Sequence, residues 1–270
     1  MSKDQAVVDA LEQVWDSIHE LCSSLTEQEW KTPTDLPAWS VQDNVAHLTD
    51  IELTLQGKPR PDHKPADISH TKSDFGASNE IGVDYRRSWP GTKVLEEFRD
   101  LTRQRVEQLR SFGDAEWEAE SFTPVGPGTA RDMLPFRVLD SWMHEQDIRR
   151  ALGRPGHLEG PAPELVFGTL RAALPFVVAK RAGVPDGFPV VLDVAGPVGQ
   201  RVGVIVDGGR GRETTNGEDP AVLMKMDLET LNVLMGGRRD ADRVLREGRV
   251  VMKGDDALGR KILENLNVVP

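Results

Sequence analysis

The sequence predicts a mostly helical α+β protein, with a four-helix bundle over residues 1–183 and a small α+β domain over residues 184–270. Two observations indicate this fold class. Apolar residues recur with the 3.6-residue period of a helix through most of the first part. After residue 184, short β-branched runs separated by Gly and Pro turns replace that pattern. Helices in one region and strands in the next are typical of α+β architecture.

The bundle helices are predicted from apolar stripes and from helix-end signals. Asp4 is a candidate N-cap of the first helix, and Ser40 opens the second, where "SVQD" resembles a capping box. Pro135 falls in the first turn of the fourth helix, where its missing N–H is tolerated, and Gly153 ends that helix. The four predicted helices cover residues 4–25, 40–55, 93–112 and 133–153.

The remaining elements follow in order. The polar stretch 56–80 is too long for a simple connection, so we expect a functional or mobile loop that crosses the bundle. A further helix over 162–182 completes the first part. "FPVVLDVAG" and "QRVGVIVDGG" then predict a hairpin, and "AVLMKM" and "RVVMKG" predict two more strands separated by helices. The chain closes on a helix.

Composition excludes several classes of partner. Lys and Arg total 33 against 44 Asp and Glu, and the net charge of −11 would repel a phosphate backbone, so we expect no nucleic acid. We find no apolar run near the ~20 residues that span a bilayer and no signal peptide, which indicates a cytoplasmic protein without a membrane partner. The single cysteine, Cys22, lies on an apolar stripe and is predicted to be buried and inert. Any thiol chemistry therefore needs an external thiol.

Two of the six histidines, His47 and His144, lie inside strongly patterned helices. At 100° per residue, Asp140, His144 and Asp147 fall within about 60° of one another on one helix face. The pair Asp140/His144 can therefore bring a carboxylate and an imidazole to one metal ion, and His47 from another helix would complete a three-ligand site with open positions. The alternative is an Asp–His hydrogen bond along an ordinary charged helix.

Asp147 has three possible roles. It can be a further carboxylate ligand, an acceptor that orients His144, or a partner of Arg150. Ligating histidines usually donate their second N–H to such a group, so we favour the orienting role in the second shell.

The segments "LPAWSVQDNVAHL" (36–48) and "RVLDSWMHEQDIRRALGRP" (137–155) resemble the two signature segments of the mycothiol-dependent maleylpyruvate isomerase family. That family belongs to the DinB-like metal-binding four-helix bundles. Trp39-Ser40 and His47 match the first segment; Asp140 and His144 match the second, although the acidic position is usually Glu. The tail "DLETLNVLMGGRRDADRVLREGRVVMKGDDALGRKILENLNVV" resembles the family's second domain, of sterol-carrier-protein type.

The resemblance implies a divalent metal, with zinc as first choice, held by His47, Asp140 and His144. It also implies mycothiol as the thiol cosubstrate, which adds to a small electrophilic substrate. Isomerisation follows if the adduct rotates and loses the thiol, and S-transfer follows if the adduct is kept. The shorter Asp140 side chain means either that its helix lies closer to the metal or that it binds through water.

In "MGGRRDADR", Arg238 is a candidate catalytic residue that would bind a substrate carboxylate, or else a solvated surface charge. We expect the site to lie between the bundle and the smaller domain. Two other functions stay open: a non-catalytic lipid or small-molecule binding protein with a vestigial metal site, and a structural or regulatory partner protein.

Overall fold

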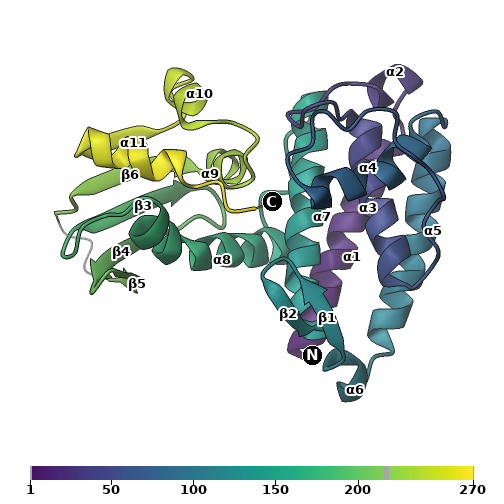
Figure 1. The fold of residues 1–270 in the computed structure, drawn as a ribbon, viewed down its shortest axis with the longest axis horizontal. Helices are drawn as coiled ribbons and strands as arrows, with labels where there is room; N and C mark the ends of the chain where they lie inside the picture. The colour runs from purple at the N-terminus through teal and green to yellow at the C-terminus, as the bar shows by residue number, and fades with distance from the viewer. Residues whose placement is uncertain (1, 216–218, 270) are drawn as a thin grey trace. The chain divides into compact units, whose positions relative to one another are not determined.

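The structure, a computed structural model, describes residues 2–215 and 219–269. It divides into two compact units, Met1–His157 and Leu158–Pro270 (Figure 1). The division lies before helix α8 (Pro161–Phe176), whereas the predicted boundary after residue 183 assigned this helix to the bundle. The reason is packing: the apolar face of α8 lies on strands of the second unit.

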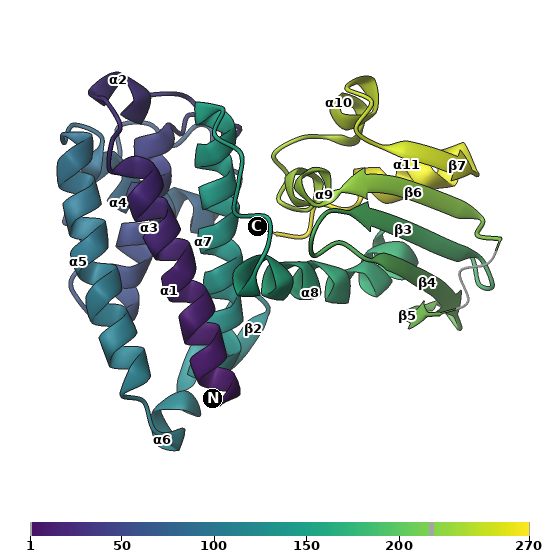
Figure 2. The same cartoon turned by 180° about the vertical axis from the view of Figure 1, so that it is seen from behind.

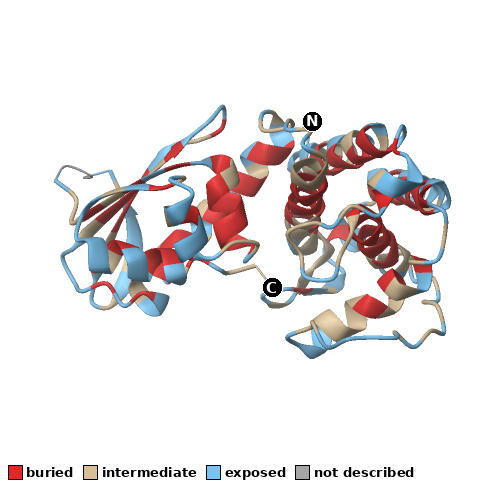
Figure 3. Ribbon diagram, turned by 90° about the horizontal axis from the view of Figure 1, so that it is seen from above, coloured by how far each residue is buried: buried red, intermediate tan, exposed pale blue. Residues whose placement is uncertain are grey.

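The first unit contains the predicted four-helix bundle, formed by α1 (Lys3–Cys22), α3 (Val41–Leu55), α5 (Gly91–Arg110) and α7 (Ala130–Leu152). Helices α1 and α3 each pack against both α5 and α7, which closes the bundle (Figures 1 and 2). In Figure 3, much of the ribbon of these helices is coloured as buried, which places the core between them. The mostly helical α+β fold class is therefore confirmed.

The helix starts were predicted with mixed success. Ser40 caps α3 in a reciprocal capping box with Asp43, as the sequence indicates. Ser2, not Asp4, caps α1. Helix α7 begins three residues earlier than expected, and Pro135 therefore lies in its second turn. Gly153 ends α7 in the left-handed conformation, with φ 63°, as predicted.

The polar stretch predicted as a loop contains part of a helix, α4 (Asp74–Arg86), which packs on α3. That prediction was wrong for residues 74–80, because α4 buries mainly polar side chains and so lacks an apolar stripe. The first unit also contains elements that were not predicted: α2 (Glu27–Trp30), α6 (Asp114–Trp117), and the hairpin β1 (Glu120–Thr123) and β2 (Gly126–Thr129).

The second unit is built on a five-stranded sheet of order β5-β4-β3-β6-β7. Strands β3 (Pro189–Ala195) and β4 (Arg201–Asp207) form the predicted hairpin, and β6 pairs with β3 in parallel. Helix α8 continues as a π-helix, η1, and packs on β4 and β5. The remaining bounds are η1 (Val177–Arg181), β5 (Arg210–Thr214), β6 (Val222–Asp227), α9 (Leu228–Met235), α10 (Ala241–Arg246), β7 (Val251–Gly254) and α11 (Asp256–Glu264).

Within the part of the chain that the structure describes, one helical segment, Pro161–Arg181, is long and apolar enough to cross a membrane by length and composition alone. This differs from the expectation that the chain holds no such run. The segment packs against a sheet, and 44% of its most apolar window is buried inside the structure. A buried core helix passes the same test, so this is weak evidence for a membrane span.

Candidate metal centre

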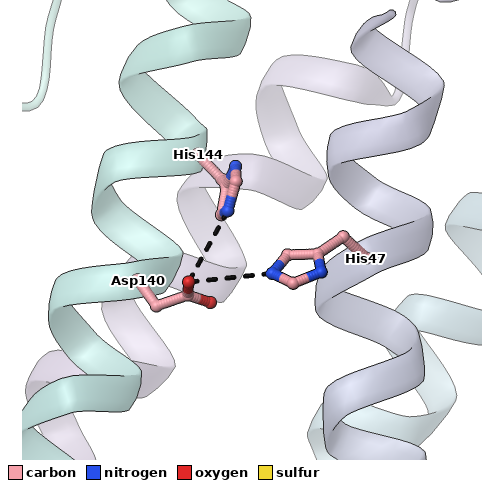
Figure 4. A group of neighbouring side chains, drawn as sticks. All are labelled: His47, Asp140 and His144. Carbon is pink, nitrogen blue, oxygen red and sulfur yellow. Dashed lines mark ion pairs between the residues drawn. The ribbon is translucent and has the colours of Figure 1, made fainter. Parts of the chain in front are cut away.

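Three potential metal ligands converge between α3 and α7. His47 lies two turns into α3, while Asp140 and His144 lie one turn apart on α7. Figure 4 shows the carboxylate of Asp140 directed at both imidazoles. The side-by-side packing of α3 and α7 therefore brings together the three residues that the sequence singles out as ligands.

The spacing of the ligand atoms suits a single ion. Asp140 Oδ1 lies 3.7 Å from His47 Nε2 and 3.6 Å from His144 Nε2, and one ligand atom from each residue lies within 4.8 Å of the others. Tetrahedral ligands with bonds of about 2.0–2.1 Å to zinc lie roughly 3.3 Å apart. The Asp140 oxygen thus lies within a few tenths of an ångström of the spacing expected between two ligands of one ion. The two imidazoles are buried, whereas the Asp140 side chain is 30% exposed, so the cluster opens to solvent beside the carboxylate.

Asn44 orients the ring of His144. Its Oδ1 lies 2.7 Å from His144 Nδ1, while its Nδ2 donates to the Ser40 carbonyl at 2.8 Å. Because the amide nitrogen is held by that carbonyl, the amide oxygen faces the imidazole and accepts the Nδ1–H. In this tautomer the Nε2 lone pair of His144, and not an N–H, is directed toward Asp140 and His47, which is how outer hydrogen bonds orient ligating histidines.

Asp147 lies beside the same ring nitrogen but farther away. Its Oδ2 is 3.5 Å from His144 Nδ1, and its Oδ1 pairs with Arg150, which also binds Asp35 at 2.9 Å. Asp147 is completely buried. Of the roles considered for it, the structure shows the pairing with Arg150, and the orienting role stays a prediction because Oδ2 lies beyond hydrogen-bond length from the imidazole. The shorter contact comes from Asn44, whose role was not predicted. Its position on the buried face of α3, three residues before His47, was the available signal.

The pKa shifts of His47 and Asp140 favour the protonation states that bind a metal ion. Burial lowers the pKa of His47, and the neighbouring Asp140 offsets only part of this effect. Burial also opposes the charge of Asp140, but the Arg137 guanidinium and the two imidazoles outweigh it and hold the pKa of this carboxyl well below its usual value. Near neutral pH the site therefore contains a neutral His47 and an ionised Asp140, the forms that bind divalent metals.

Trp39 forms one wall of the cluster. Its ring lies 5.8 Å from the ring of His144 in a stacked arrangement and 5.1 Å from that of His47. The indole N–H donates to Glu80, a buried carboxylate on α4 whose Oε1 also lies 3.0 Å from His70 Nε2. The polar stretch around residues 56–80 is therefore tied to the candidate site through Glu80, which the sequence did not reveal.

Two other predicted residues lie elsewhere. Cys22 is buried, as predicted, and burial raises the pKa of its thiol to about 12. Arg238 belongs to the second unit, in the turn between α9 and α10, where its Nη1 donates to the Gly236 carbonyl at 2.7 Å.

Comparison with known proteins gives a consistent result. The family model of the mycothiol maleylpyruvate isomerase N-terminal domain matches residues 11–149, more than half of the chain. The fold is similar to the crystal structure of the mycothiol-dependent maleylpyruvate isomerase, with a TM-score of 0.59, 16% sequence identity and 93% of each chain covered. A mutant of that enzyme matches over the same shares at a TM-score of 0.53 and 16% identity. No curated protein matches. The predicted family is thus confirmed, and the chain belongs to the mycothiol-dependent maleylpyruvate isomerase family.

Proposed function

We propose that this protein is an isomerase that uses mycothiol and a divalent cation held by His47, Asp140 and His144. The observation that carries the proposal is the convergence of two imidazole nitrogens and one carboxylate oxygen at a spacing suited to one ion. Membership of a family named for mycothiol-dependent isomerisation supports the thiol. Zinc is our first candidate for the metal, because two histidines and a carboxylate form a common catalytic zinc site.

Each side chain contributes a defined property to such a site. His47 offers a neutral nitrogen, His144 directs its Nε2 to the same point, and Asp140 supplies one negative charge. Three protein ligands leave coordination positions open, and the partly exposed Asp140 marks the side from which small molecules reach them. A bound cation would supply Lewis acidity that favours deprotonation of an incoming thiol. We propose that Asp147 supports this arrangement from outside the ligand set, beside His144 Nδ1.

The reacting thiol must come from outside the chain. Cys22 is buried, and a thiol with a pKa of about 12 stays protonated near neutral pH. In the proposed reaction, the thiolate of mycothiol forms a C–S bond to one carbon of a double bond conjugated to a carbonyl group, whose oxygen takes up the electron pair as an enolate. The former double bond is now single and rotates. Collapse of the enolate breaks the C–S bond, restores the double bond in the other geometry and releases the thiolate unchanged. A protein with one buried cysteine suits a reducing compartment, so we place it in the cytoplasm.

Arg238 remains our candidate for binding a carboxylate of the substrate. It follows Gly237, which has a φ of 63°, and its side chain is partly exposed. A guanidinium suits a carboxylate because its donors match the two oxygens. Arg238→Gln should raise KM for a carboxylate substrate more than it lowers kcat, and an unchanged KM would remove Arg238 from the site.

The metal is tested by elemental analysis of protein purified without added metal. We expect about one divalent ion per chain, the stoichiometry of a three-ligand catalytic site. His47→Ala and His144→Ala should lose it. His63→Ala is the matched control, because His63 pairs with Asp84 away from the three ligands. Equal metal content in wild type and both ligand variants would refute the site.

The reaction is tested by titrating mycothiol against the metal-loaded protein and following isomerisation of maleylpyruvate. We expect turnover that requires both thiol and metal. An accumulating thiol adduct would instead indicate S-transfer. Metal binding without thiol binding would favour the non-catalytic binding protein.

A further inference from the structure

A buried chain of charged side chains lies next to the three candidate ligands. Arg137 on α7 donates from Nε to Glu52 Oε1 at 2.8 Å, and Glu52 lies on α3, the helix that carries His47. Arg105 on α5 places its Nε 3.6 Å from the other oxygen of Glu52. Glu52 is completely buried, and the Arg137 side chain is only 3% exposed. The chain therefore connects three of the four bundle helices inside the core.

The free end of this chain reaches Asp140. Arg137 Nη1 donates to Asp140 Oδ2 at 2.6 Å, while Oδ1, the other oxygen, faces His47 and His144. The two carboxylate oxygens thus have different partners. One is held by a charge-assisted hydrogen bond, and the other is directed at the position where the imidazole nitrogens converge.

The hydrogen bond from Arg137 restrains the terminal side-chain torsion of Asp140, which otherwise varies widely. The terminal torsion of an aspartate is broad and roughly two-fold, so an unrestrained Asp140 can rotate and present either oxygen or both. Arg137 cannot follow such a rotation, because Glu52 holds its Nε and the side chain is enclosed by the core.

We propose that Arg137 is a positioning residue that binds Oδ2 of Asp140, so that Asp140 meets a divalent cation through Oδ1 alone. This inference rests on the proposed function, because it concerns the same metal site. Arg137 itself touches neither the cation nor the substrate. It acts through the short Asp140 side chain, whose single well-placed oxygen gives the site its third ligand.

The guanidinium has two opposing effects on metal affinity. Its charge repels a cation, and its hydrogen bond orients the ligand. The charge is largely compensated, because Glu52 and Asp140 both lie within hydrogen-bond distance of Arg137. Orientation should therefore decide the outcome, and removal of such an outer partner typically costs about 10–100-fold in metal affinity.

The test measures the Zn²⁺ dissociation constant by competition with a chromophoric chelator, on the full chain. Arg137→Met should weaken binding by about 10–100-fold. Arg105→Met is the matched control, because Arg105 faces the same Glu52 but does not bond to Asp140. The Zn²⁺ affinity of this variant should stay within about twofold of wild type. In an Asp140→Ala background, where two histidines still bind Zn²⁺ weakly, adding Arg137→Met should change affinity by no more than about twofold.

A second measurement does not require the weakly binding Asp140→Ala protein. The visible absorption bands of bound Co²⁺ report the number and kind of ligands, so they should change in Arg137→Met and not in Arg105→Met. The proposal is overturned if Arg137→Met keeps wild-type affinity and spectrum, or if it weakens binding equally with and without Asp140. Failure of the wild type to bind Zn²⁺ would instead refute the proposed metal site itself.

Discussion

Replacing Asn44 with alanine tests whether its amide, or the carboxylate of Asp147, orients His144. The substitution removes the acceptor that lies 2.7 Å from His144 Nδ1 and leaves a buried N–H. An unsatisfied buried donor costs about 1–3 kcal/mol, and 1.4 kcal/mol corresponds to about tenfold in a binding constant. Asp147 Oδ2, at 3.5 Å, can take over part of the bond after a small rotation of the ring. We therefore expect Asn44→Ala to weaken Zn²⁺ binding by about tenfold, the lower end of the range for such outer partners.

The assay is the Zn²⁺ dissociation constant, measured together with the thermal unfolding of the metal-free protein. Asp147→Asn is the comparison, because it keeps the size of the side chain and removes the charge 3.5 Å from the same nitrogen. Its affinity should fall less than that of Asn44→Ala. The assignment fails if Asn44→Ala binds Zn²⁺ as tightly as wild type, or if Asp147→Asn is the weaker binder of the two.

Further predictions concern pH, the cysteine and two glycines. Burial lowers the pKa of His47 in the folded protein, so below its unfolded pKa of about 6.5 the unfolded chain binds a proton that the folded chain does not. The free energy of unfolding therefore falls as the pH drops, by up to about 1.4 kcal/mol per pH unit. In urea unfolding of the chelator-treated proteins, this free energy should depend less steeply on pH in His47→Gln than in wild type. Cys22, with a pKa of about 12, should not react with Ellman's reagent at pH 8 until the protein is unfolded, and full labelling of folded protein would contradict this. Gly91→Ala should destabilise the protein by about 1–3 kcal/mol, because the new methyl group would meet the buried Trp30 ring at 2.2 Å. Gly168→Ala, which meets nothing within 4 Å on α8, should stabilise it by up to about 1 kcal/mol in the same unfolding assay.

The elements that could be predicted are those whose signal is local. The capping box at Ser40 and the apolar stripes of the bundle helices depend only on neighbours along the chain. Helix α4 escaped prediction because its buried residues include Glu80, which accepts a hydrogen bond from Trp39, and Arg86, which pairs with Glu97 on α5. The prediction grouped helix α8 with the bundle, whereas it packs on strands of the second unit, because an apolar stripe does not specify which partner covers it.

The candidate site also contains residues that local spacing predicts and residues that it does not. Asp140 and His144 share one face of a helix, and helical spacing alone predicts that they lie together. Asn44 and Arg137 were not singled out, because the first acts across from α3 to α7 and the second depends on Glu52 of a different helix. Such contacts follow from the relative register of two packed helices, which no local pattern records.

The spacing of four polar residues along α7 limits which insertions and deletions the protein can accept. Arg137, Asp140, His144 and Asp147 are separated by three, four and three residues and so form one stripe down the helix. An inserted or deleted residue between them would turn the remainder of the stripe by about 100° and separate its members. Substitutions around this stripe can accumulate without moving it, whereas a change in length within it cannot be absorbed. The segment is therefore constrained more by the number of its residues than by the identity of most of them.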